Sequence, residues 1–140
     1  MKTILISISL PFFAIQLFCQ VINWNQSKNW KLYSVFDRIA LNYSLDSIDH
    51  IGNILLNNDT IQMFLSNSQA WPKDKSAMWM SAYLCTYELD GNIRKIVISS
   101  YGGFFYDYAT KQYYQINVES RDNWLAYLLK KSIILMTPKD

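Results

Sequence analysis

The spacing of apolar side chains changes along this chain, from helical periods to alternation and back again. Between residues 46 and 55 apolar positions recur three or four residues apart, which predicts an amphipathic helix capped by Asp46. Its apolar face consists of Ile48, Ile51, Ile54 and Leu55. A second, shorter helix is expected from Asn58 or Asp59. Its apolar stripe consists of Ile61, Phe64 and Leu65.

The middle of the chain follows the pattern of β-strands. After a polar loop at 66–76, an aromatic stretch from Met78 to Leu89 predicts a first strand. The dipeptide at 90–91, Asp-Gly, is typical of a two-residue hairpin turn. Further strands are expected at 93–101, 104–108 and 112–118, with a Gly-Gly turn at 102–103 and another turn at 109–111.

The chain ends on a third helical pattern, with Ser120 as the expected N-cap and Pro138 beyond its end. Its apolar face consists of Trp124, Leu125, Leu128, Leu129, Ser132, Leu135 and Met136. Residues 20–43 fit either a short strand or a helical turn. The order of elements predicts an α+β fold, in which a four-stranded antiparallel meander carries the N-terminal helices and the C-terminal helix on one face.

The first residues predict export. Lys2 precedes an apolar run of about 15 residues, which is short for a transmembrane helix and suits a signal peptide. We expect cleavage after Cys19, so that residues 1–19 are a signal peptide and residues 20–140 form one periplasmic or secreted domain without an integral membrane span. Lipid attachment at Cys19 is the alternative. After cleavage Cys85 would be the only cysteine, so the domain would depend on packing rather than on disulfides.

Net charge and composition restrict the classes of partner that the protein can bind. The net charge is +2 and the basic residues are scattered, which argues against a nucleic-acid partner. Aromatic residues make up 16% of the chain. On the last strand Tyr113 faces away from Tyr114, because successive strand residues point to opposite faces. We therefore expect Tyr114, Ile116 and Val118 in the core. Trp79, Tyr83 and Tyr87 would form an aromatic ladder with Tyr113 on the open face.

None of the candidate catalytic groups forms a recognisable motif. His50 is the only histidine, and Ser99 and Ser100 lack the Gly-x-Ser-x-Gly pattern of a nucleophile elbow. Asp46 and Asp49 with His50 have metal-ligand spacing, but acids at a helix start have a simpler role with the dipole. We therefore expect no catalytic residues, no metal site and no cofactor.

These observations favour an exported binding protein without catalysis, in particular a bacterial periplasmic inhibitor or immunity protein that neutralises a toxin or a cell-wall-degrading enzyme. The alternative is an envelope-associated carbohydrate-binding module that uses surface Trp and Tyr rings. A small hydrolase with a site near Asp107 is a third hypothesis. The residues expected to contact the partner are Trp79, Tyr83, Tyr101, Gly102, Gly103, Phe105, Asp107 and Tyr113.

Overall fold

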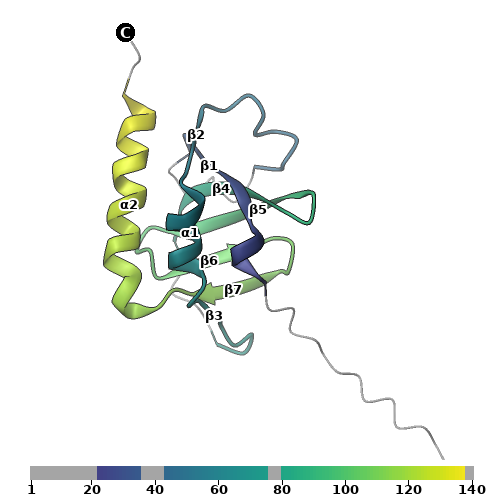
Figure 1. Ribbon diagram of the computed structural model, residues 1–140, viewed down its shortest axis with the longest axis vertical. Helices are drawn as coiled ribbons and strands as arrows, with labels where there is room; N and C mark the ends of the chain where they lie inside the picture. The colour runs from purple at the N-terminus through teal and green to yellow at the C-terminus, as the bar shows by residue number, and fades with distance from the viewer. Residues whose placement is uncertain (1–21, 36–42, 76–79, 138–140) are drawn as a thin grey trace, which may run out of the picture.

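The computed structural model describes residues 22–35, 43–75 and 80–137. Its strands are β1 (Lys28–Tyr33), β2 (Asn53–Leu55), β3 (Gln69–Ala70), β4 (Ser81–Leu89), β5 (Asn92–Ser99), β6 (Phe104–Asp107) and β7 (Gln112–Gln115). A 3-10 turn, η1 (Trp24–Gln26), and two helices, α1 (Asn58–Leu65) and α2 (Val118–Met136), complete the described elements. The strands form one antiparallel sheet in the order β2-β1-β4-β5-β6-β7-β3 (Figure 1).

The central meander forms as predicted, with strands β4 to β7 paired in sequence order. The β4–β5 hairpin turns at Asp90 and Gly91, whose φ angles of 53° and 74° both lie in the left-handed region. A two-residue turn with two positive φ angles matches the right-handed twist of the flanking strands. The predicted hairpin turn is therefore confirmed, since Leu89 pairs directly with Asn92 across it.

The prediction of four strands is wrong, because three more strands extend the sheet at its edges. Strand β1 lies in residues 20–43, for which the pattern fitted either a strand or a helical turn. Strand β2 lies in the stretch 46–55, which was predicted to be a helix, and β3 lies in the predicted loop at 66–76. Within residues 46–55, Ile48 and Ile51 pack on one face of the sheet, whereas Ile54 packs on the other. The helical spacing was thus coincidental, and pairing with β1 satisfies the backbone of β2.

The two helices begin where asparagine side chains cap them. Asn57 accepts a hydrogen bond from the Thr60 amide at 2.8 Å, which starts α1 at the predicted place. Asn117 accepts from the Glu119 amide at 3.0 Å, so α2 begins at Val118 and not after Ser120. Val118 was predicted in the core but is exposed, since it opens the helix instead of ending β7.

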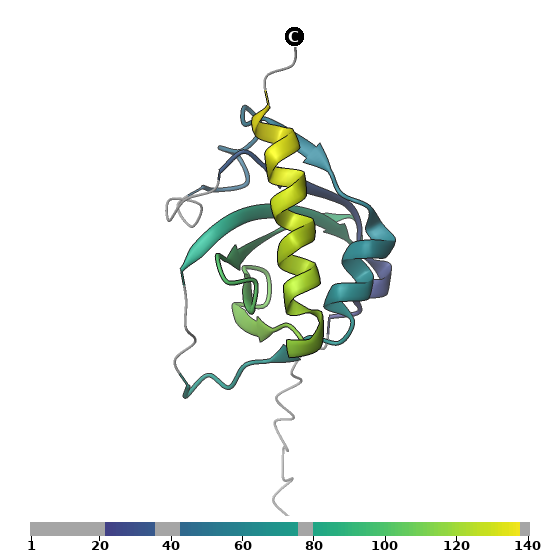
Figure 2. The same cartoon turned by 90° about the vertical axis from the view of Figure 1, so that its left-hand side faces the viewer.

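Most aromatic side chains of the strands belong to the core between the sheet and the helices. Trp30 stacks on Tyr87 with ring centroids 4.6 Å apart, and Trp24 packs edge-on against Phe105 at 5.5 Å. Trp124 of α2 is fully buried over the same face. Figure 2 shows α2 lying across the sheet, with α1 beside it. Packing of this aromatic core holds the fold together, and the only described cysteine, Cys85, is a buried free thiol.

A smaller apolar cluster covers part of the opposite face of the sheet. Its buried members are Tyr33, Val35, Ile48, Leu84 and Val97. This second cluster lies over β1, β4 and β5 and leaves β6 and β7 less covered. We call the side of β6 and β7 that is turned away from the helices the open face; it carries Phe104, Tyr106 and Tyr113.

The predicted aromatic ladder does not form. Tyr83 and Tyr87 belong to the core cluster and are buried on the helix side of the sheet, whereas Tyr113 lies on the open face. The reason is the register between β6 and β7. It pairs Tyr113 with Tyr106 on one face of the sheet and Phe105 with Tyr114 on the other face.

The signal peptide and one member of the predicted aromatic ladder are not covered by the structure. Trp79 and the signal-peptide residues 1–19, including Cys19, lie outside the described ranges. Neither of the two described α-helices has the length and hydrophobicity needed to cross a lipid bilayer.

Candidate functional site

A pocket of about 410 Å³ opens between the open face and the loop that follows β3. It is lined by Trp71, Pro72, Lys73, Lys75, Tyr106, Lys111, Gln112 and Tyr113. We call it the lysine–aromatic pocket. Its volume lies within the range of pockets that bind small molecules or the side chains of a partner.

The wall formed by the loop is held in place by Trp71. The Trp71 amide donates to the carbonyl of Tyr113 at 2.8 Å, which extends the β3–β7 pairing by one bond. The indole packs edge-on against Phe104 with centroids 5.0 Å apart, and its Nε1 donates to the Lys75 carbonyl at 3.2 Å. The backbone between Trp71 and Lys75 is therefore organised before any ligand binds.

The side chain of Gln112 links this loop to β7 through two hydrogen bonds. Its Nε2 donates to the Trp71 carbonyl at 2.6 Å and to the Tyr113 carbonyl at 2.9 Å. The Gln112 residue is 9% exposed, so both hydrogen bonds are partly shielded from water. The pocket floor is consequently part of the sheet rather than a flexible appendage.

The third wall consists of Tyr106 and Tyr113 on the open face, and Tyr108 packs beside them outside the pocket lining. Tyr106 and Tyr113 are direct cross-strand partners with ring centroids 4.7 Å apart, and Tyr108 meets Tyr106 edge-on at 4.9 Å. Burial raises the pKa of Tyr106 and of Tyr108, and the neighbouring tyrosines raise both further. Tyr106 and Tyr108 therefore stay neutral at physiological pH. The group offers ring faces together with hydroxyl groups.

Three ammonium groups surround these rings. Lys73, Lys75 and Lys111 are exposed, and none forms an ion pair with a residue that the structure describes. Asp74 is the one acid among them in the loop. The pocket therefore combines a rigid aromatic surface with an excess of positive charge. This combination suits an anionic ligand that also has a flat or apolar part.

A buried lysine lies beside this group and was not singled out from the sequence. Lys95 on β5 is 7% exposed, donates to the Tyr43 carbonyl and places its Nζ 3.7 Å from the centroid of the Tyr108 ring. Burial lowers its pKa. Lys95 is thus a structural cation that anchors the loop containing Tyr43. The sequence signal for it is a lysine placed directly before the apolar run Ile96–Ile98 of the strand.

The predicted contact residues are divided between core and surface. Tyr113 lines the lysine–aromatic pocket and Tyr101 is 58% exposed elsewhere. Tyr83 and Phe105 are buried. Gly102 is also buried, and the predicted Gly-Gly turn packs against α2 instead of projecting.

Asp107 is a buried structural carboxylate. Its Oδ1 accepts from the Tyr87 hydroxyl at 2.8 Å, while Oδ2 accepts from the Thr110 amide at 2.8 Å and from the Thr110 hydroxyl at 2.7 Å. The two bonds from Thr110 close the β6–β7 turn, and together with the bond from Tyr87 on β4 they satisfy the buried carboxylate. Burial raises the pKa of Tyr87, and the adjacent carboxylate adds to this effect.

The other candidate reactive groups lie apart. His50 is exposed on a loop, whereas Cys85 is buried in the core, where desolvation raises its thiol pKa. Ser99 is fully buried and its hydroxyl accepts from the Phe104 amide at 3.2 Å. Within the described ranges, no three His, Cys, Asp or Glu side chains gather as a metal site.

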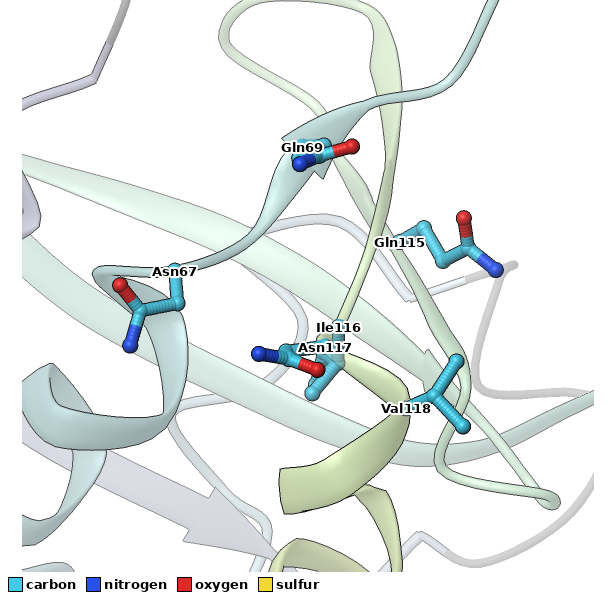
Figure 3. A pocket seen from close by; sticks show the side chains of 6 residues that line it. All are labelled: Asn67, Gln69, Gln115, Ile116, Asn117 and Val118. Carbon is cyan, nitrogen blue, oxygen red and sulfur yellow. The ribbon is translucent and has the colours of Figure 1, made fainter.

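Two further pockets differ in chemistry. One of about 210 Å³ is lined by four amide side chains, and Figure 3 shows that they come from separate segments: Asn67, Gln69, Gln115 and Asn117. Because Asn117 is used as the helix cap and the pocket carries neither a charge nor a ring, it is the weaker candidate. The other, of about 430 Å³, lies over β1, β2 and β4.

The pocket residue that the sequence pattern did not single out is Trp71, which was predicted to lie in a polar loop. A tryptophan between polar residues is rarely left exposed, and this one proves to organise the loop. Lys73 and Lys75 share one loop, whereas Lys111 is distant in sequence and joins them only through the β3–β7 pairing. The chain matches no protein-family model, no curated protein and no solved structure, so its function has to be argued from this geometry.

Proposed function

We propose that this protein is an exported, non-catalytic binding protein that recognises a protein partner through the lysine–aromatic pocket. The favoured partner is a toxin or a cell-wall-degrading enzyme, and the protein would act as a periplasmic inhibitor or immunity protein. The observation that carries this proposal is the pocket itself, in which rings held by the sheet are bordered by three lysines that form no ion pair with any described residue.

The composition of the pocket is that of a protein-binding hot spot. Trp and Tyr are enriched among residues that dominate interface energies, because they contribute a large contact area at a small entropic cost. Here Trp71 and Tyr113 are already fixed by backbone pairing, so binding would not have to order them. Preorganisation of this kind favours affinity.

The lysines favour an acidic partner surface. Enzymes that cleave glycosidic bonds carry paired carboxylates in their clefts, and such a cleft attracts a cationic loop. Lys73 and Lys75 stand on a turn closed by the hydrogen bond from the Lys75 amide to the Pro72 carbonyl at 3.1 Å. Occlusion of the cleft by this turn would inhibit the enzyme without any chemistry.

Affinity purification from the native envelope tests the proposal. The wild-type protein should recover a specific partner, and a double variant with Lys73→Glu and Lys111→Glu should lose it. The matched control carries Lys28→Glu and Arg121→Glu, which make the same charge change away from the pocket. Equal recovery by both variants, or no partner at all, would contradict the proposal.

The second candidate is an envelope-associated carbohydrate-binding module, because Trp71, Tyr106 and Tyr113 flank one pocket and can stack on sugar rings. Sedimentation with purified peptidoglycan distinguishes it. Retention that Tyr113→Ala abolishes, and that the double lysine variant keeps, would favour the carbohydrate function over the inhibitor function.

A further inference from the structure

Exposed apolar side chains gather in two patches away from the lysine–aromatic pocket. Of the ten large hydrophobic residues that are exposed in the described ranges, seven belong to these patches. The first, which we call the α2 tip, contains Leu129, Ile133, Ile134 and Met136. The second, which we call the acidic pocket, contains Leu45, Leu55 and Ile93. Figures 1 and 2 show the C-terminal end of α2 at the same end of the molecule as β2.

The α2 tip is apolar and cationic. Its four large side chains are between 49% and 58% exposed, whereas Leu128 and Ser132 on the other side of the helix are buried against the body. Lys130 is exposed beside them, whereas Lys131 is half-buried with its Nζ 5.6 Å from the centroid of the Tyr127 ring. No acid occurs between Leu129 and Thr137. An exposed apolar patch of this kind marks an interaction site, because water solvates it poorly.

The acidic pocket has the opposite charge. It measures about 430 Å³, and Leu55 and Ile93 at its edge are 64% and 65% exposed. Asp46, Asp49 and Glu88 line it together with one base, Lys31. Glu88 pairs with the Lys28 ammonium at 3.2 Å, so the excess of negative charge comes from the two aspartates.

Two features leave the acidic pocket open to an apolar and cationic occupant. Neither Asp46 nor Asp49 forms an ion pair with a described residue. On its floor the Tyr33 and Thr86 hydroxyls bond to each other at 3.1 Å, so both are satisfied without a ligand.

We propose that the occupant of the acidic pocket is the α2 tip of a second copy of this chain. Each surface supplies what the other lacks: aliphatic side chains meet a pocket with aliphatic edges, and the lysines of the tip meet two aspartates that form no ion pair within the described ranges. The α2 tip extends from the helix side of the sheet, whereas the acidic pocket lies on the other face with Tyr33 and Ile48. Two copies close into a symmetric dimer when both tip–pocket contacts form at once. This inference is independent of the proposed function.

Sedimentation velocity of the purified protein over a range of concentrations tests self-association. We expect reversible assembly that weakens as the salt concentration rises, because the contact includes charges. Ile133→Asp in the α2 tip and Leu55→Asp in the acidic pocket should each weaken assembly about tenfold or more. Met63→Asp is the matched control, since Met63 is 59% exposed on α1 and belongs to neither patch.

Mixing the two defective variants tests the pairing of tip with pocket. The Ile133→Asp copy keeps an intact pocket and the Leu55→Asp copy keeps an intact tip, so a one-to-one mixture should form a heterodimer that neither variant forms alone. A wild-type protein that stays monomeric, or a mixture that stays monomeric while both variants are folded, would overturn the proposal. So would binding of the monomer to vesicles of anionic lipid that Ile133→Asp abolishes and Leu55→Asp leaves intact, since the tip would then be a membrane contact.

Discussion

The tight contact between Gly102 and α2 allows one stability prediction to be worked out in detail. Gly102 has a φ angle of +64°, and a Cβ added there would lie 3.1 Å from the Cβ of Leu125. The Leu125 Cβ is fixed to the helix backbone and cannot swing away. Gly102→Ala therefore combines a left-handed backbone with a steric conflict, and its effect is transmitted to the packing of α2 on the sheet.

The magnitude follows from the two contributions. A left-handed backbone costs an alanine about 1–2 kcal/mol, of which about 0.5–1 kcal/mol is offset because alanine restricts the unfolded chain. Overpacking against Leu125 adds about 1–3 kcal/mol. We expect Gly102→Ala to lower the free energy of unfolding by about 1.5–4 kcal/mol, a large share of the stability of a small domain.

Gly91→Ala is the matched control for this prediction. Gly91 has a φ angle of +74°, but a Cβ added there would meet nothing within 4 Å. Only the backbone contribution applies, so we expect a loss of about 0.5–1 kcal/mol. Urea denaturation of both variants at 25 °C measures the difference. Equal losses for the two variants would refute the packing of α2 on the Gly-Gly turn.

Three further predictions concern the core, the pocket and a cap. Tyr87→Phe removes a 2.8 Å hydrogen bond to the buried Asp107 carboxylate and should cost about 1.5–3 kcal/mol in urea denaturation at pH 7. The folded state raises the pKa of Tyr87 above its ordinary value of 10.0. The neutral Tyr87 side chain therefore contributes stability that is lost as the pH rises beyond 10. Tyr87→Phe should reduce this alkaline loss of stability in the same assay. Lys111→Gly relieves a φ angle of +52° and should change stability at pH 7 by less than about 1 kcal/mol while weakening retention of the partner. Asn57→Ala removes the cap of α1 and should lower the midpoint of thermal unfolding, with a loss of about 1 kcal/mol.

Local chemistry made part of the fold predictable. Asp90 and Gly91 sit in a turn whose backbone angles few other residues accept, and the cap before α1 is a short-range hydrogen bond. The meander and the two helices follow from such signals. The α+β class was therefore available from sequence, together with the order of the central strands.

Long-range pairing decided what the sequence could not provide. The isoleucines at 48, 51 and 54 have a helical spacing, yet β1 draws residues 53–55 into the sheet and separates the three side chains between two faces. Tyr83 and Tyr113 alternate correctly within their own strands. Only the register across four strands determines that they face opposite sides.

The candidate site shows the same division. Tyr113 was predicted as a contact residue and does line the lysine–aromatic pocket, whereas Trp71 and the three lysines come together through the two-residue strand β3. Strands of that length have no periodicity to detect. Phe105 and Asp107 were chosen for their chemistry, but their strand face and the Thr110 turn bury them.

The most direct test of the proposed function is site-specific photo-crosslinking in the producing cell. A photoreactive amino acid that replaces Tyr113 would sit in the lysine–aromatic pocket, and the same amino acid in place of Met63 would sit on α1, away from it. We predict one protein adduct at position 113 and none at position 63. An adduct at position 63 alone, or no adduct at either position, would contradict a partner bound in this pocket.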